Sequence, residues 1–143
     1  MSDKPKEPAR PTDAELEILT VLWSLGPTTV REVHETVNRR KSAQNKTQNK
    51  APSSTQYTTV LKTMQIMAEK GLVKRNEKQR AHVYEPSRSR EWTQKQIAGD
   101  LLQRAFGGSA RSLMLGALSA KKASRADLAE IRRVIDEYEK GAK

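Results

Sequence analysis

The chain has 143 residues, with 27 basic and 17 acidic side chains that give a net charge of +10, and this length suits one domain or one domain with a small appendage. The absence of cysteine from the sequence excludes disulfides, thiolate metal sites and cysteine nucleophiles. No apolar run approaches the roughly 20 residues that a membrane span needs, and the N-terminus has no signal-peptide core, so we expect a cytoplasmic protein without membrane insertion.

The first predicted helix follows a tail. Residues 1–11 contain three prolines among charged side chains and predict a disordered segment. Thr12 and Glu15 then fit a capping box, in which a hydroxyl and a carboxylate each satisfy a free backbone N–H group. The helix that begins there is expected to run to Leu25, because Gly26-Pro27 is a strong stop signal.

A short second helix is predicted by three valines at three- and four-residue spacing, Val30, Val33 and Val37, and is expected to end at about Arg40. Residues 41–53 have no apolar period and carry three lysines, so they are predicted to form a flexible basic loop.

A third helix is predicted from Ser53 or Ser54 onward. Its apolar residues recur at the helical period, at Tyr57, Val60, Leu61, Met64 and Met67. Gly71 is placed to be the left-handed residue that ends the helix, with the next leucine folding back on the last turn.

A hairpin and three more helices follow. The segments 72–77 and 82–85 contain β-branched and aromatic residues and predict two short strands, closed by Pro86. Helices are then predicted over 88–106 and 112–118, separated by Gly107-Gly108. Ser124 and Asp127 match a second capping box, which opens the last helix.

This order of elements predicts a mainly α protein, an α+β winged helix-turn-helix over residues 12–86, with a three-helix dimerisation region over residues 87–143. The last helix has an apolar seam that can pack against the 92–106 helix of the same chain or against a second copy. We favour a homodimer, because a segment below about 60 residues forms a free-standing core with difficulty. The residues predicted for the dimer interface are Ile97, Leu101, Leu113, Leu128, Ile131, Ile135 and Tyr138.

The charge is concentrated in one part of the chain. Residues 39–80 contain eleven basic and two acidic side chains, a net charge of +9 in 42 residues. A basic surface confined to a loop, one helix and a hairpin indicates a polyanionic partner. The third helix also offers short polar side chains opposite its apolar stripe, which suits a helix that enters the major groove of double-stranded DNA.

In this interpretation the hairpin is a wing, with Arg80 at its tip and further cations at its base. The residues predicted to bind DNA are Thr55, Gln56, Thr58, Thr59, Lys62, Lys74, Arg75, Arg80 and His82. A nonspecific architectural DNA-binding protein and a winged-helix module that binds acidic protein surfaces are the alternatives.

No enzymatic site is expected. His34 and His82 stand 48 positions apart, and no nucleophile, base and orienting group come together in the sequence, so we expect no metal, no cofactor and no catalysis. Tyr57 and Trp92 could stack on bases, but both belong to apolar stripes, and we expect them in the core.

Several segments resemble one family of regulators. They are Leu16–Leu19 with Leu22-Trp23, Val30–Val33, Tyr57–Leu61, Lys70–Val73 and Arg80–Tyr84, and the likeness continues through Leu101–Phe106, Gly107-Gly108 and Ser112-Leu113. Over residues 12–140 the chain resembles the BlaI/MecI penicillinase-repressor family.

The resemblance implies a cytoplasmic homodimeric repressor with an N-terminal winged helix on DNA and C-terminal helices at the dimer interface. Its members bind inverted-repeat operators with TACA/TGTA half-sites, and Thr58, Thr59, Lys62 and Arg80 match positions that face DNA in them. Leu61 stands where the best-known members have an arginine. In those members a membrane sensor metalloprotease triggers cleavage after an Asn-Phe pair, and Gly116-Ala117 occupies the matching positions here.

Overall fold

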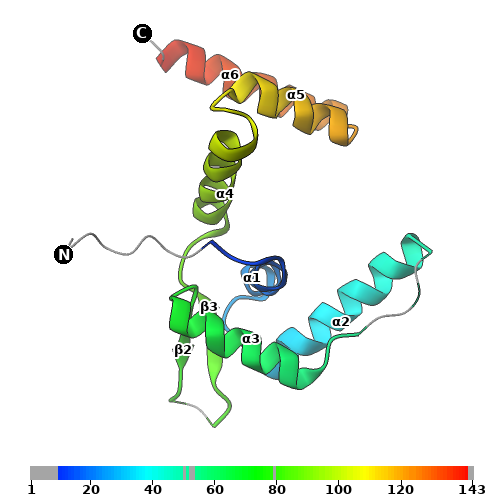
Figure 1. Ribbon diagram of the computed structural model, residues 1–143, viewed down its shortest axis with the longest axis vertical. Helices are drawn as coiled ribbons and strands as arrows, with labels where there is room; N and C mark the ends of the chain where they lie inside the picture. The colour runs from blue at the N-terminus through cyan, green and yellow to red at the C-terminus, as the bar shows by residue number, and fades with distance from the viewer. Residues whose placement is uncertain (1–9, 50, 52–53, 79, 142–143) are drawn as a thin grey trace, which may run out of the picture. The chain divides into compact units, whose positions relative to one another are not determined.

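The structure is a computed structural model that describes residues 10–49, 51, 54–78 and 80–141. Its elements are α1 (Asp13–Leu25), β1 (Thr28–Thr29), α2 (Val30–Thr47), α3 (Tyr57–Lys70), β2 (Val73–Asn76), β3 (Val83–Pro86), α4 (Arg90–Ala105), α5 (Ala110–Ala120) and α6 (Arg125–Gly141) (Figure 1). The predicted class, mainly helical with a small antiparallel sheet, is confirmed. The chain forms two compact units, one up to Ile97 and one from Ala98.

The first helix begins as its capping box predicts. The Thr12 hydroxyl accepts a hydrogen bond of 3.2 Å from the Glu15 N–H group, and the Glu15 carboxylate accepts one of 2.9 Å from the Thr12 N–H group. At the other end Gly26 has a φ of 78°, and its N–H group donates to the Leu22 carbonyl. Only glycine adopts this backbone conformation without strain, so α1 ends where the sequence predicts.

One apolar core holds the first unit together, and α1, α2, α3 and the hairpin all contribute to it. Its buried side chains are Ile18, Leu19, Val21, Leu22, Val30, Val33, Val37, Val60, Met64, Met67, Val73 and Tyr84. The helices α2 and α3 pack against each other as well as against α1, and α3 also packs against β2. Only the faces of α2 and α3 outside these contacts are left for solvent or a partner.

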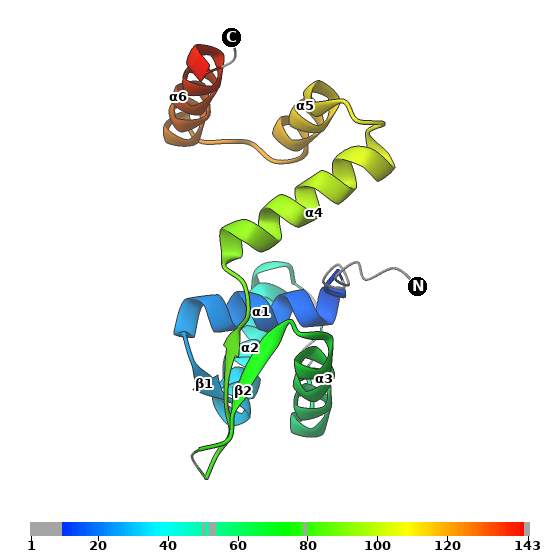
Figure 2. The same ribbon diagram turned by 90° about the vertical axis from the view of Figure 1, so that its left-hand side faces the viewer.

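The sheet has three antiparallel strands in the order β1-β3-β2. Figure 1 and Figure 2 show β2 and β3 running side by side. The predicted hairpin is confirmed, with strands slightly displaced from the expected 72–77 and 82–85. The strand β1 was not predicted, because two threonines are too few to show a period of two; they pair with Val83 and Tyr84.

The helix α2 is longer than predicted, and the prediction of a loop from Lys41 is wrong for residues 41–47. The helix continues to Thr47, and the Gln48 N–H group donates to the Gln44 carbonyl at its end. Alanine, glutamine and lysine are good helix formers, and periodicity detects only helical segments that bury an apolar face. Residues 50, 52 and 53 of the predicted loop, and residues 1–9 of the predicted tail, lie outside the described residues.

The helix α3 starts at Tyr57, later than the predicted 53 or 54, because Gln56 has an extended backbone and is the N-terminal cap. Its end agrees with the prediction. Gly71 has a left-handed backbone with a φ of 82°. The Leu72 N–H group donates a hydrogen bond of 2.9 Å to the Met67 carbonyl, and the Leu72 side chain packs against the core.

The first turns of α4 belong to the first unit. The Trp23 indole on α1 donates a hydrogen bond of 3.0 Å to the Arg88 carbonyl just before α4. Trp92, expected in the core, is half-buried, with the Arg88 guanidinium 4.8 Å from its ring centre. The second unit therefore begins eleven residues after position 87, the boundary expected from the sequence.

The second unit contains the end of α4 with α5 and α6, whose existence the sequence predicts. The hydroxyls of Ser109 and Ser124 accept hydrogen bonds from the Ser112 and Asp127 N–H groups, so each serine caps the helix that follows. Among residues 98–141, none is buried. These three helical segments therefore contain no closed core of their own.

Candidate nucleic-acid interface

The exposed face of α3 is polar over its first two turns. Gln56, Thr58, Thr59 and Lys62 are exposed, whereas Val60 is buried in the core. The structure therefore brings four of the predicted DNA-binding residues onto one accessible surface at the N-terminal end of one helix. Gln65, one turn further along, is also exposed and polar, although it was not among the predicted residues.

Thr55 differs from these residues because three side chains of α2 contact it. The Asn38 amide group pairs with both backbone groups of Thr55: its oxygen accepts from the N–H group at 2.8 Å, and its nitrogen donates to the carbonyl at 3.0 Å. The Lys41 ammonium donates to the Thr55 hydroxyl at 2.5 Å. Nε2 of His34 lies 2.9 Å from the same carbonyl.

These contacts explain why a half-buried Thr55 precedes the helix and why α3 begins where it does. Two side-chain hydrogen bonds satisfy the peptide groups of Thr55 that a helix would otherwise use. The side chains of Asn38, Lys41 and His34 thereby fix the entry of the chain into α3. Sequence reasoning missed this role for all three residues, since a spacing of 17 residues between Asn38 and Thr55 has no period to reveal it.

Tyr57 is 44% exposed, so the expectation that it belongs to the core is wrong. Its ring lies edge-on to His34, with the ring centres 5.6 Å apart. The apolar stripe of α3 is continuous in sequence, but the core closes over it only from Val60 onward. Ile66 is also 38% exposed, and both residues add apolar area beside the polar face of α3.

The wing places its predicted residues at the surface, since Lys74, Arg75, Arg80 and His82 are all exposed. Arg75 is engaged within the hairpin: its guanidinium lies 2.5 Å from the Glu77 carboxylate. The hydrogen bond with the Tyr84 phenol and the Glu77 charge raise the pKa of Arg75 further above its ordinary value. Arg75 therefore keeps its charge and is paired with Glu77, and Lys74 stands in register with Glu85 on the neighbouring strand.

An ion pair between Lys70 and the buried Glu15 connects the far end of α3 to α1. Glu15 is 3% exposed, and both of its carboxylate oxygens accept hydrogen bonds from the Lys70 ammonium, at 3.1 and 2.9 Å. Burial by itself would raise the pKa of Glu15, but the Thr12 N–H group and Lys70 outweigh it and hold the pKa below its usual range. The ion pair, together with the contacts to Thr55, fixes both ends of α3.

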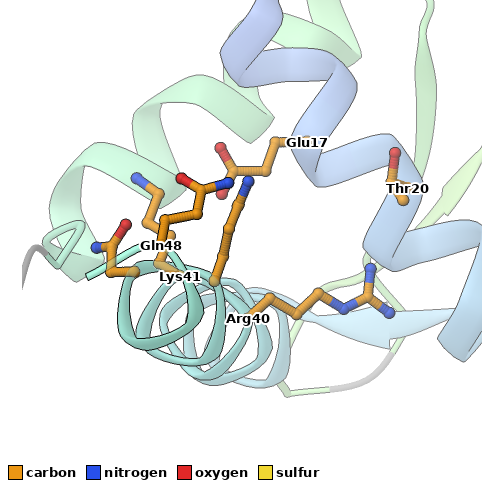
Figure 3. A pocket seen from close by; sticks show the side chains of 7 residues that line it. Glu17, Thr20, Arg40, Lys41 and Gln48 are labelled. Atoms are coloured by element: carbon orange, nitrogen blue, oxygen red, sulfur yellow. The ribbon is translucent and has the colours of Figure 1, made fainter. Parts of the chain in front are cut away.

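A polar pocket of about 350 Å³ lies between α1 and the second half of α2 (Figure 3). The residues that line it are Glu17, Thr20, Arg40, Lys41, Gln44, Asn45 and Gln48. Arg40 therefore belongs to the flank of α2 that faces α1. Among the described residues, no three His, Cys, Asp or Glu side chains come together in a way that could hold a metal ion.

The residues predicted for dimerisation lie on the helices where they were expected. Ile97, Leu113, Leu128 and Ile131 are half-buried, whereas Leu101, Ile135 and Tyr138 are 43%, 46% and 74% exposed. Met114, Leu115 and Leu118 of α5, which were not among the residues predicted for the interface, are exposed as well.

The helices α2 and α3 followed by the β2–β3 hairpin form a winged helix-turn-helix, in which an exposed polar helix face stands beside a basic hairpin. Proteins of this class include many transcriptional regulators. The sequence profile of the penicillinase repressor family matches residues 11–137, and the chain belongs to that family. This confirms the resemblance, and because the family is one of transcriptional regulators, it also supports the expectation that the chain is not an enzyme.

Two curated relatives support the assignment. "Transcriptional regulator BlaI" of Mycobacterium tuberculosis, in strain CDC 1551 / Oshkosh and in strain ATCC 25618 / H37Rv, is 31% identical to this chain over 131 residues. The match covers 90% of this chain and 85% of the relative. In the part of the chain that the structure describes, no helix has both the length and the apolar character needed to cross a membrane.

Proposed function

We propose that the protein is a homodimeric transcriptional repressor that binds inverted-repeat operators in promoter DNA and acts in the cytoplasm, where that DNA lies. The observation that carries the proposal is the exposed face of α3, which presents Gln56, Thr58, Thr59 and Lys62 without an acidic residue before Glu69. Membership of a family of transcriptional regulators supports the same conclusion.

The N-terminal half of α3 suits the major groove. Amide and hydroxyl side chains can hydrogen-bond to base edges, and the groove is wide enough to admit a helix. The free backbone N–H groups of the first turn make that end of the helix partly positive, which favours nearby phosphates. We therefore assign base recognition to Gln56, Thr58 and Thr59, and phosphate binding to Lys62.

The wing supplies contacts of a different kind. Arg80, His82 and Lys74 are exposed on a hairpin beside α3, and we assign them to the DNA backbone, where contacts position a protein without reading sequence. Because Arg75 is already paired with Glu77, we expect its contribution to be smaller than that of Arg80. Thr55 acts indirectly, by setting where α3 begins.

The second unit supports the assignment of a dimer. None of residues 98–141 is buried, and large apolar side chains are exposed on α5 and α6. A second copy can cover them, and a two-fold interface pairs the same surface from each chain. Two winged helices related by a two-fold axis then require an operator that is an inverted repeat, with half-site centres separated by whole turns of DNA.

A footprint on the promoter of the protein's own gene and of its neighbours tests the proposal. We expect protection of one site with two-fold sequence symmetry, and a preference of roughly 10³-fold or more over random DNA. Sedimentation of the unbound protein should give the mass of a dimer. Uniform protection with no preferred site would instead support the nonspecific architectural alternative, which the +9 charge of residues 39–80 favours.

A further inference from the structure

We infer that the C-terminal half of α2 is a second DNA-backbone surface, in which Arg39 and Lys46 bind phosphates beside the groove that α3 occupies. This inference rests on the proposed function, because it takes the N-terminal end of α3 as the part that enters DNA. We call the flank of α2 that carries Arg39 and Lys46 the outer flank.

The first observation is that this part of α2 is not required by the core. The last buried residue of the helix is Val37, yet the helix continues for ten residues to Thr47. Over that length every side chain is exposed or half-buried. An α-helix rises about 1.5 Å per residue, so the extension reaches about 15 Å beyond the core. The apolar core therefore does not account for its length.

The second observation is where the extension starts. Asn38 and Lys41 contact Thr55, two residues before the first residue of α3. The extension of α2 therefore begins beside the end of α3 that presents Thr58 and Thr59. A helix that leaves from this point lies close to the rim of any groove that α3 enters, where the phosphates are.

The third observation is that one flank of the extension faces α1, whereas the outer flank does not. Arg40 lines the pocket with Glu17 and Thr20 of α1, so its flank faces the protein (Figure 3). Successive residues of an α-helix are about 100° apart, so Arg39 and Lys46 lie about 100° and 120° around the helix from Arg40. They lie about 140–180° from Lys41, Gln44 and Gln48, which line the same pocket, and therefore on the other flank. The two side chains are within about 20° of each other and about 10 Å apart along the axis. The exposed face of α3 is likewise turned away from α1, since its buried face packs there.

Charge supports a polyanion as the occupant of the outer flank. No acidic residue occurs from Thr36 to Ala68, a stretch that contains both Arg39 and Lys46 as well as the polar face of α3. Glu35, one turn before Arg39, is exposed, and its negative charge marks the end of the basic surface toward the N-terminus of α2. Arg39 and Lys46 on α2, with Lys62 on α3, therefore give this part of the chain a positive charge, as phosphate binding requires.

The experiment measures the salt dependence of binding to two duplexes, the footprinted promoter fragment and a random sequence of the same length. The double variant Arg39→Ala/Lys46→Ala should lower the slope of log affinity against log salt by about 1.8, since each phosphate contact contributes about 0.9. Between 50 and 200 mM salt, wild-type affinity should therefore fall about 12-fold more than that of the variant, on both duplexes.

Arg40→Ala is the matched control, because it removes the same charge from the neighbouring position on the flank that faces α1. Arg40→Ala should leave the slope of log affinity against log salt close to that of the wild type. The charge-conserving double variant Arg39→Lys/Lys46→Arg should have the full wild-type slope. Circular dichroism checks that each variant keeps its helices; the substituted side chains are exposed.

An unchanged slope in the double variant would overturn the inference, and so would an equal loss in Arg40→Ala, which would mean that only bulk charge matters. If the wild-type protein binds both duplexes equally, the proposed repressor function fails, but the slope still decides the role of the outer flank. If the wild-type protein binds neither duplex, both proposals are overturned.

Discussion

Replacing Glu15 by glutamine removes one charge from a nearly closed site and keeps the side-chain shape. Glu15 accepts one hydrogen bond from the Thr12 backbone and two from Lys70, and 4% of its side chain is exposed. A glutamine can still accept from Thr12, but it offers Lys70 a neutral oxygen. Hydrogen bonds to charged groups contribute about 1.5–3 kcal/mol. Because the Lys70 side chain is 32% exposed, water compensates part of the loss, and we expect a destabilisation of about 2 kcal/mol.

The pH dependence of the free energy of unfolding shows whether the ionised Glu15 carboxylate causes this loss of stability. The pKa of Glu15 is lower in the folded chain than its ordinary value of 4.5. The ionised group therefore contributes stability that is fully present above about pH 4.5 and is lost as the pH falls through the lower folded pKa. Urea denaturation of the wild type and of Glu15→Gln should give a difference in the free energy of unfolding that is constant above this pH and shrinks below it.

Glu69→Gln is the control, since it removes the same charge from an exposed residue next to Lys70. It should change the free energy of unfolding by no more than about 0.5 kcal/mol. The reasoning is refuted if the two variants are equally destabilised at pH 7, or if the loss in Glu15→Gln is the same at pH 3 and pH 7.

The remaining predictions concern DNA binding, folding stability and assembly. Thr59→Ala should weaken binding to the footprinted operator by about 1–3 kcal/mol and leave binding to random DNA unchanged, as measured by fluorescence anisotropy. Arg80→Ala should weaken binding to both duplexes alike and reduce the salt slope by about 1; equal losses on both DNAs for Thr59→Ala would contradict this division of roles. Asn38→Ala should lower the stability by about 1–3 kcal/mol, because the Thr55 N–H group loses its partner, and Asn38→Asp, which keeps the acceptor for that group, should lose less in urea denaturation. Ile135→Asp should weaken the dimer at least about tenfold in sedimentation equilibrium, an expectation that a fully dimeric variant would refute.

The sequence by itself determined the local features. The capping box of Thr12 and Glu15, the left-handed Gly71 and the apolar stripe of α3 depend on residues three to seven positions apart, and such spacings are visible in the chain. The same holds for the polar face opposite that stripe and for the concentration of charge in residues 39–80. These local patterns also suffice for the predicted class of winged helix, which the structure confirms.

The tertiary structure alone decided how far α2 extends, which residue begins α3, that Tyr57 is exposed, and which polar groups meet. Glu15 and Lys70 are 55 residues apart, and Asn38 and Thr55 are 17 apart, so no period relates the members of either pair. A helical segment without buried residues, such as the end of α2, has no apolar stripe by which the sequence could predict it. Local sequence therefore determines where helices can form, whereas long-range polar contacts determine how α3 is presented to its partner.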